Sequence, residues 1–317
     1  MKILITGANG FIGFHLIQLL NEAFDVKGLD FDLTENIDPV KEHRKSFLLQ
    51  KGLPISKIDI RDKQKLENFI SDFSPDTIVH LAACTGISAS EINRDLYFEV
   101  NVSGFHNILE SCIINNIKNI IYASSSSVYN NNSEIFLENN VSDNQLSFYG
   151  YTKRLNEHMA DNFSKRYDIN IIGLRFFTVY GSYVRTDMAA WNFLNSLMGN
   201  KPITLYNQGN VYRDFTHVSD IVKSIELIVK KDKTNNLGHQ LFNIGNGKPA
   251  LISDYLNEMA ICLDKKPNII YKPLPANELQ YTHASTEKLY SFIGYKPKTS
   301  LQEGVREMVD WFLKSKY

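Results

Sequence analysis

The sequence predicts an α/β fold, a doubly wound parallel sheet followed by a smaller C-terminal α/β domain. Two observations predict it. Short apolar runs alternate with stretches of helical periodicity in the first half of the chain, and a glycine-rich turn joins the first run to the first helix. Strands that alternate with helices form a parallel sheet covered on both faces. The 317 residues suffice for one large domain or two modest ones.

The expected strands of the sheet are short and apolar. They span residues 2–6, 25–30, 77–83 and 119–123. The expected helices span residues 63–73, 103–115 and 152–166. We expect residues 1–177 to form a dinucleotide-binding domain whose sheet is completed by segments near 214–245. Residues 178–317 are then expected to form a substrate-binding domain.

The turn after the first strand carries a dinucleotide fingerprint of the Rossmann type. In Gly7-Ala8-Asn9-Gly10-Phe11-Ile12-Gly13, the first glycine permits the tight turn. The second lets the backbone approach a pyrophosphate, and the third lets helix and strand pack closely. The N-terminus of the following helix offers free N–H groups to phosphates. The expected cofactor ligands in this turn are Gly7, Asn9, Gly10, Phe11, Ile12 and Gly13.

An acidic residue stands where such a fingerprint requires one. Asp30 ends the second strand, about 20 residues after the first glycine, and can accept both ribose hydroxyls of an adenosine. Because its carboxylate repels a 2′-phosphate and no Lys or Arg follows until Lys41, NAD is favoured over NADP. Asp59 and Ile60, after a later extended stretch, are expected to flank the adenine. The alternative for Asp30 is a turn carboxylate without a ligand.

Tyr149 and Lys153 form the most informative pair in the chain. Residues four apart lie one above the other on a helix, so a phenol and an ammonium can share one pocket. A nearby Lys⁺ favours the phenolate and lowers the pKa of the Tyr, which can then take a proton from a sugar hydroxyl. With 16 Tyr in the chain, the spacing alone also fits a packed Tyr beside a solvated Lys.

Composition and charge exclude several classes of protein. With 43% apolar residues, 22% charged residues and a formal net charge of −1, the chain resembles a globular protein with no basic excess for nucleic acid or anionic membranes. The three cysteines are widely spaced and form no metal-ligand pattern, which indicates a reducing cytosol and no metal site. No apolar run reaches about 18 residues, so no membrane span is expected. The expected location is the cytoplasm.

These motifs, with others further along the chain, resemble the extended short-chain dehydrogenase/reductases, in their nucleotide-sugar epimerase/dehydratase branch. The resemblance covers essentially the whole chain in the order of the family. Its carriers are Thr6 to Gly13, His80-Leu81-Ala82-Ala83, Ser124-Ser125-Ser126-Ser127-Val128-Tyr129, Tyr149 with Lys153, Arg175-Phe176-Phe177-Thr178-Val179-Tyr180-Gly181 and Arg213-Asp214-Phe215-Thr216-His217.

The resemblance implies a reaction at one carbon of the sugar. NAD stays bound, and the phenolate of Tyr149 takes the proton of the 4-hydroxyl while C4 is oxidised to a ketone. Lys153 lowers the pKa of Tyr149 and contacts the nicotinamide ribose, and Ser125 hydrogen-bonds the reacting hydroxyl. Related dehydratases carry Asp-Glu where this chain has Ser126 and Ser127, so dehydration is not expected. Further cofactor ligands implied by the resemblance are Leu81, Ala82, Ala83 and Asn101.

The UDP-glucuronate 4-epimerases show the closest resemblance within that branch, sharing the segment Arg185-Thr186-Asp187-Met188-Ala189. Ser126, Thr178 and Arg185 then hold the uronate carboxylate. Arg213 binds the diphosphate, since this position closes the nucleotide site in the family. The alternatives are surface ion pairs, of Arg185 with Asp187 and of Arg213 with Asp214.

The departures from the family pattern lie on the substrate side. Ser88-Ala89 replaces an Arg-Tyr, Ser182-Tyr183-Val184 replaces a Pro-Trp-Gly, and Ala276-Asn277-Glu278 replaces a Pro-Gly-Asp. Three hypotheses follow. The first is an NAD-dependent nucleotide-sugar 4-epimerase, with a UDP-sugar favoured and a GDP-sugar possible. The second is a C4 dehydrogenase that releases a 4-keto sugar for polysaccharide precursors, and the third is an NAD-binding scaffold without turnover. Relatives pair through helices near 98–115 and 152–166, so a homodimer is expected.

Overall fold

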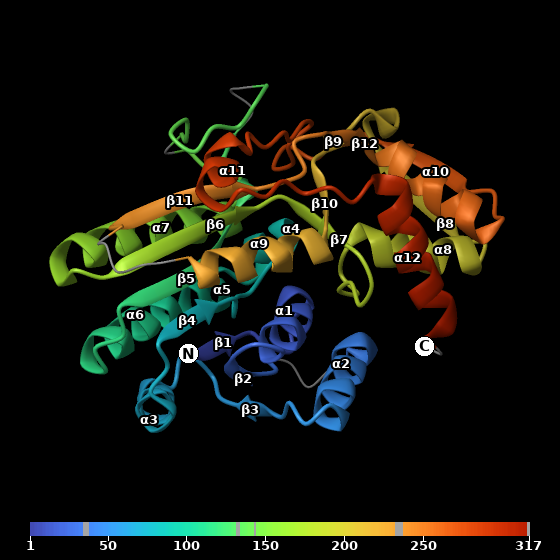
Figure 1. The fold of residues 1–317 in the computed structure, drawn as a ribbon. Helices are drawn as coiled ribbons and strands as arrows, with labels where there is room; N and C mark the ends of the chain where they lie inside the picture. The colour runs from blue at the N-terminus through green and yellow to red at the C-terminus, as the bar shows by residue number, and fades with distance from the viewer. Residues whose placement is uncertain (34–37, 131–133, 143, 232–236, 316–317) are drawn as a thin grey trace.

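A seven-stranded parallel sheet forms the centre of the computed structural model, which describes residues 1–33, 38–130, 134–142, 144–231 and 237–315 (Figure 1). The strand order is β11-β6-β5-β4-β1-β2-β3, and neighbouring strands in this sheet are parallel. The strands are β1 (Lys2–Thr6), β2 (Asp25–Asp30), β3 (Ile55–Lys57), β4 (Thr77–His80), β5 (Asn119–Ser125), β6 (Asn170–Phe176) and β11 (His239–Ile244). The order reverses between β1 and β4, where open α/β sheets bind their ligands.

Helices cover both faces of this sheet (Figure 1). One layer comprises α1 (Phe11–Asn21), α2 (Pro39–Gln50), α9 (Val218–Lys230) and α11 (Glu287–Ile293). The other comprises α3 (Lys63–Phe73), α6 (Gly104–Ile114) and α7 (Phe148–Tyr167), with the short α4 (Ile87–Ile92) and α5 (Arg94–Phe98) beside α7 and a π-helical turn at Glu99–Ser103.

The remaining elements gather at one end of the sheet (Figure 1). Three small strand pairs are β7 (Thr178–Tyr180) with β10 (Phe215–His217), β8 (Pro202–Tyr206) with β13 (Asn268–Lys272), and β9 (Tyr212–Arg213) with β12 (Ala250–Leu251). The helices here are α8 (Ala189–Met198), α10 (Ile252–Leu263) and α12 (Leu301–Lys314), and α10 packs on both others. Single 3₁₀ turns lie at Ser126–Val128 and Asn207–Gly209.

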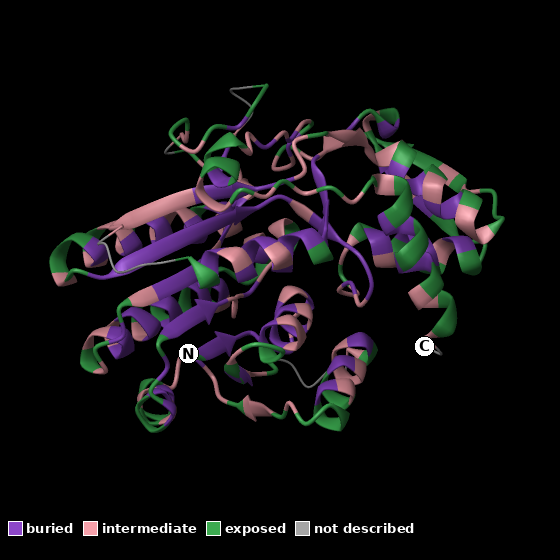
Figure 2. Cartoon of the chain, viewed as in Figure 1, coloured by how far each residue is buried: buried purple, intermediate pink, exposed green. Residues whose placement is uncertain are grey.

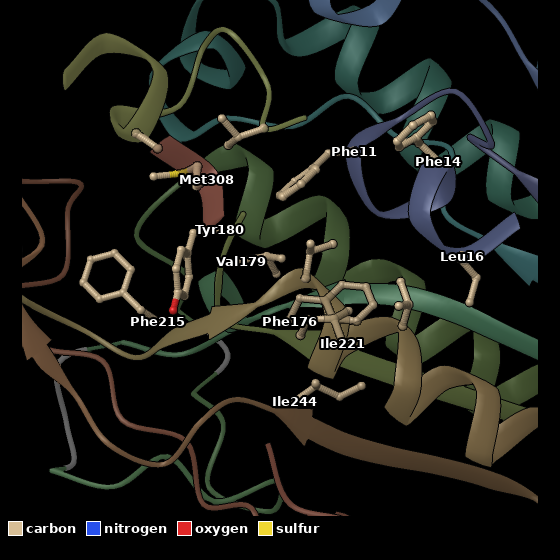
Figure 3. Packing of buried hydrophobic residues seen from close by; sticks show 14 of the residues in the cluster. Phe11, Phe14, Leu16, Phe176, Val179, Tyr180, Phe215, Ile221, Ile244 and Met308 are labelled. Carbon is tan, nitrogen blue, oxygen red and sulfur yellow. The ribbon is translucent and has the colours of Figure 1, made fainter. Parts of the chain in front are cut away.

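The sheet lies in the buried core, and the outer faces of the helices are exposed (Figure 2). β6 is buried along its whole length, as the continuous apolar run of a parallel strand requires. Figure 3 shows Val179 and Tyr180 following Phe176, with Phe215 and Met308 close to Tyr180. Tyr180 and Phe215 meet edge-on, with ring centroids 6.1 Å apart. This apolar cluster joins the sheet to the C-terminal elements.

The first two strands and the helix at Lys63–Phe73 match the predicted ranges. The predicted start of the helix after Tyr149 is wrong, because α7 begins at Phe148. The Ser147 hydroxyl accepts a hydrogen bond from the Gly150 N–H at 3.1 Å and caps the helix there. Tyr149 and Lys153 therefore share one helix. None of the helices in the described residues has the length and apolar character of a membrane span.

Candidate active site and coenzyme groove

Two adjoining cavities lie at the carboxyl ends of the sheet strands, and a third adjoins them among the C-terminal elements. The central pocket, about 340 Å³, is lined by Ser125, Tyr149 and Lys153. The coenzyme groove, about 950 Å³, shares Gly7, Gly10 and Arg185 with the central pocket and extends to Asp30 and Asp59. The outer pocket, about 540 Å³, shares Thr178, Arg213 and Glu278 with the central pocket. Together they form one elongated site.

The glycine turn has the geometry of a pyrophosphate site. Gly7 has φ +70°, and a Cβ there would lie 2.6 Å from the Ala82 nitrogen. A Cβ on Gly13 would lie 2.2 Å from the Gly7 carbonyl oxygen, so helix and strand meet too closely for any side chain. α1 begins at Phe11 without a side-chain cap, which leaves its first N–H groups free for an anion. These features fit the phosphates of a dinucleotide.

Asp30 is hydrogen-bonded at the far end of the groove, but a cation also holds it. Its carboxylate accepts hydrogen bonds from the backbone N–H groups of Asn9 (2.9 Å) and Phe31 (2.8 Å). The Lys41 ammonium lies 2.9 Å from the same carboxylate and 2.6 Å from Asp32. Lys41, the first cation that follows Asp30 in the sequence, therefore lies against its carboxylate, because α2 brings this residue back across the groove.

The remaining predicted cofactor residues fall into two groups. Ile60 and Asp59 line the groove, and the Asp59 carboxylate is held by the Arg61 guanidinium at 2.7 Å. Leu81, Ala82 and Ala83 follow β4 and also line it. Asn101, in contrast, is not a lining residue. Its side chain bonds the Cys84 N–H (2.8 Å), the Cys84 carbonyl (2.9 Å) and the Thr152 hydroxyl (3.1 Å), and so braces the loop after β4 against α7.

Ser125, Tyr149 and Lys153 converge in the central pocket. Ser125 ends β5, and its hydroxyl hydrogen-bonds the Tyr149 phenol. The Lys153 ammonium lies 5.9 Å from the centroid of the Tyr149 ring and donates a hydrogen bond to the Ala123 carbonyl at 3.0 Å. Burial lowers the pKa of Lys153 to about 8. The three groups can thus act on a single hydroxyl.

Two opposing effects set the pKa of Tyr149. Burial is the larger and raises it above the ordinary value for a phenol. The hydrogen bond from Ser125 and the positive charge of Arg185 lower it. Sequence reasoning assigned the lowering to Lys153, whereas the cation that acts on Tyr149 in this structure is Arg185.

A buried ion pair beneath the serine run was missed in the sequence. Glu157 lies one turn after Lys153 on α7, and its carboxylate accepts hydrogen bonds from Arg175 Nε (2.7 Å) and Nη2 (2.8 Å). The Ser124 hydroxyl donates to the same carboxylate at 2.7 Å. Each charged side chain is 1% exposed. Through this hydrogen bond the pair holds Ser124, the neighbour of Ser125, in place. The sequence signal for Glu157 was its position four residues after Lys153, on the same face of the helix.

The four predicted substrate residues all line the central pocket: Ser126, Thr178, Arg185 and Arg213. Arg185 binds Asp187 through both arms of its fork, at 2.9 Å and 2.6 Å, so the ion pair considered as an alternative forms within the site.

Arg213 pairs with Glu278 at 3.0 Å, so the alternative pairing with Asp214 is wrong. The Asp214 carboxylate instead accepts three backbone N–H groups, from Asn246, Gly247 and Ala284. Glu278 belongs to a segment that departs from the family pattern, and its contact with Arg213 spans 65 positions of the chain. Burial lowers the pKa of Arg213. No cluster of three or more His, Cys, Asp or Glu side chains suited to a metal ion occurs in the described ranges.

Comparison with known proteins links this geometry to one family. The model of the NAD dependent epimerase/dehydratase family matches residues 3–245. Protein CapI of Staphylococcus aureus is 37% identical over 329 residues, covering 99% of this chain and 98% of its own. UDP-glucuronate 4-epimerase 4 of Arabidopsis thaliana is 35% identical over 331 residues, covering 99% and 75%. The solved structure of UDP-glucuronic acid 4-epimerase from Bacillus cereus with UDP-glucuronic acid and NAD has a TM-score of 0.89 at 30% identity, covering 99% of each chain.

Proposed function

Because the chain belongs to the NAD dependent epimerase/dehydratase family, we propose that it is an NAD-dependent 4-epimerase whose substrate is UDP-glucuronate. The observation that carries the proposal is the convergence of Ser125, Tyr149 and Lys153 beside a glycine turn that fits a pyrophosphate. A base, a hydrogen-bond donor and a cation then surround one sugar hydroxyl.

Each residue of the site has a separate role in the proposed epimerisation. NAD, when bound in the groove lined by Gly7, Gly10 and Asp30, would supply the acceptor for the C4 hydride and its donor to the opposite face of the 4-keto sugar. Tyr149 takes the proton of the 4-hydroxyl as its phenolate and gives it back in the second half of the reaction. The Ser125 hydroxyl holds the reacting oxygen, the charge of Arg185 favours the phenolate, and Lys153 would contact the nicotinamide ribose. Ser126 and Ser127 hold no acid or base for the loss of water, so the ketone is only reduced again.

Two features of the pockets and the names of relatives support a UDP-linked uronate. Ser126, Thr178 and Arg185 can bond a carboxylate at C6. Arg213 lies where the central and outer pockets meet, as a ligand of the diphosphate would. Relatives named as UDP-glucuronate 4-epimerases share this architecture. In the proposal, residues 1–177 with the segments near 214–245 hold NAD, and residues 178–317 hold the nucleotide sugar.

We also propose a homodimer in which α6 and α7 of two copies pack together. Ile114 on α6 and Tyr151 on α7 are exposed apolar side chains that such packing would cover. The three cysteines are all free, in keeping with a reducing cytosol. The similarity to Protein CapI supports a place in polysaccharide precursor synthesis.

The test is a proton NMR time course with UDP-glucuronate, purified protein and no added oxidant. We expect UDP-galacturonate to appear until both epimers equilibrate, and Tyr149→Phe to slow this by at least about a hundredfold. Tyr290→Phe, at an exposed tyrosine of α11 that lines none of the three cavities, is the matched control and should retain the rate. Accumulation of NADH and a ketone would instead indicate the dehydrogenase. Turnover of GDP-sugars alone would overturn the UDP assignment.

A further inference from the structure

Arg44, on α2, connects the coenzyme groove to the segment 181–188, which leads from β7 to α8. Its side chain is 2% exposed and lines the groove. Nε donates a hydrogen bond to the Asn9 carbonyl at 2.9 Å, and Nη1 donates one to the Tyr183 carbonyl at 2.8 Å. One buried guanidinium therefore joins two segments that are distant in the sequence.

The first of these carbonyls belongs to the glycine turn. Asn9 lies between Gly7 and Gly10, and its backbone N–H donates to the Asp30 carboxylate at 2.9 Å. Asn9 is buried, and its N–H and its carbonyl are held by side chains from two different elements, Asp30 of β2 and Arg44 of α2. The turn that fits the NAD pyrophosphate is therefore held in part by Arg44.

The second carbonyl belongs to a residue with an unusual backbone conformation. Tyr183 has φ +61°, a left-handed conformation that a non-glycine residue keeps only where its surroundings hold it. Its ring packs on Phe14 of α1, with centroids 4.5 Å apart, and edge-on against His43 of α2 at 5.6 Å. Arg185 follows two residues later, so the backbone that presents it to the sugar depends on contacts with α1 and α2.

A second hydrogen bond ties the same segment to α2. The Thr186 hydroxyl donates to the Asp38 carboxylate at 3.1 Å, and Asp38 is the N-cap of α2. The helix also carries Lys41, whose ammonium lies 2.9 Å from the Asp30 carboxylate. α2 therefore contacts the coenzyme groove through Lys41 and Arg44, and the segment 181–188 through Arg44 and Asp38.

We propose that Arg44 is a positioning residue that couples the binding of NAD to the binding of the sugar nucleotide. The inference rests on the proposed function, because it concerns the two ligands of that same site. A dinucleotide that orders the glycine turn also fixes the Asn9 carbonyl, and through Arg44 it fixes the Tyr183 carbonyl and the segment that carries Arg185. Because coupling between two ligands is reciprocal, a bound sugar nucleotide retains NAD by the same factor. Such coupling keeps the hydride acceptor in place while the 4-keto sugar occupies the site.

Calorimetric titration of the full chain with NAD, alone and in saturating UDP-glucuronate, tests the proposal. All proteins carry Tyr149→Phe, which slows turnover during the titration. Without a further substitution, UDP-glucuronate should tighten NAD binding at least about fivefold. In Arg44→Met, which keeps a long side chain without a donor, this factor should fall below about twofold. Arg44→Lys replaces the spaced donors of the guanidinium with a single nitrogen and should give an intermediate factor.

Arg306→Met is the matched control, because it removes an exposed arginine that lines none of the three cavities, and it should leave the factor unchanged. If UDP-glucuronate does not tighten NAD binding before Arg44 is replaced, the inference is overturned. It is also overturned if Arg44→Met weakens NAD binding equally with and without the sugar nucleotide, because Arg44 then only supports the fold. Should Arg44→Met fail to fold, an unchanged factor in Arg44→Lys overturns it. The proposed function fails by a different readout, the absence of UDP-galacturonate when the wild-type protein is incubated with NAD and UDP-glucuronate.

Discussion

Replacing Glu157 with Gln should destabilise the protein more than any exposed charge substitution on the same helix. The substitution removes the charge opposite Arg175 while keeping the shape of the side chain. Its amide NH₂ would face the guanidinium, donor against donor, in place of one of the two carboxylate oxygens, which now accept hydrogen bonds from Arg175 at 2.7 and 2.8 Å. Both side chains are 1% exposed, so water cannot compensate the stranded charge.

The expected loss is about 3–5 kcal/mol in the free energy of unfolding, the usual cost of removing one partner from a buried pair. Urea denaturation followed by circular dichroism measures it. Asp161→Asn is the matched control, since Asp161 lies one turn further along α7, pairs with Lys165 and is 46% exposed. It should cost at most about 0.5 kcal/mol.

A double variant sharpens this test. Glu157→Gln combined with Arg175→Met removes both charges, so a large part of the loss should be recovered. A loss below about 1 kcal/mol for Glu157→Gln alone, or a double variant less stable than the single one, would refute the reasoning.

The remaining predictions concern the glycine turn, the proposed base Tyr149 and the stability of the protein at low pH. Gly13→Ala should abolish NAD binding in calorimetry, because a Cβ would lie 2.2 Å from the Gly7 carbonyl oxygen; retained affinity would contradict this. Arg185→Met should move the acid limb of kcat/KM for UDP-glucuronate to higher pH, since this cation lowers the pKa of Tyr149, and an unmoved limb would count against it. Burial alone would raise the folded-state pKa of Glu157, but the hydrogen bond and charge of Arg175 lower it overall. The ion pair therefore stabilises the folded protein fully above the unfolded pKa of about 4.3, and this stabilisation is lost as pH falls through the folded pKa. Acid unfolding curves of wild type and Glu157→Gln should therefore converge at low pH.

Local patterns in the sequence predicted the sheet and the centre of the site. Gly7, Gly10 and Gly13 act within a single loop between a strand and a helix. Tyr149 and Lys153 lie four residues apart on one helix. Such features depend on backbone geometry and short spacing, which a single chain displays directly. The family resemblance supplied the reaction, and the comparisons confirm the family.

Contacts between distant segments could not be predicted. Lys41 reaches Asp30 only because α2 folds back over the groove, so a count of intervening residues misjudged the local charge. Arg213 and Glu278 lie 65 positions apart, and the neighbouring Asp214 was the more obvious partner. The Asp214 carboxylate instead accepts hydrogen bonds from backbone N–H groups, which no sequence pattern indicated.

The fate of the C4 hydrogen shows whether the hydride returns to the sugar that released it. UDP-glucuronate carrying deuterium at C4 is converted by the wild-type protein in ordinary water, and the product is analysed by NMR and mass spectrometry. UDP-galacturonate should keep the deuterium at C4, because the hydride leaves and returns within one closed site while Tyr149 exchanges only the hydroxyl proton. Loss of the label to water, or its accumulation in free NADH, would contradict it.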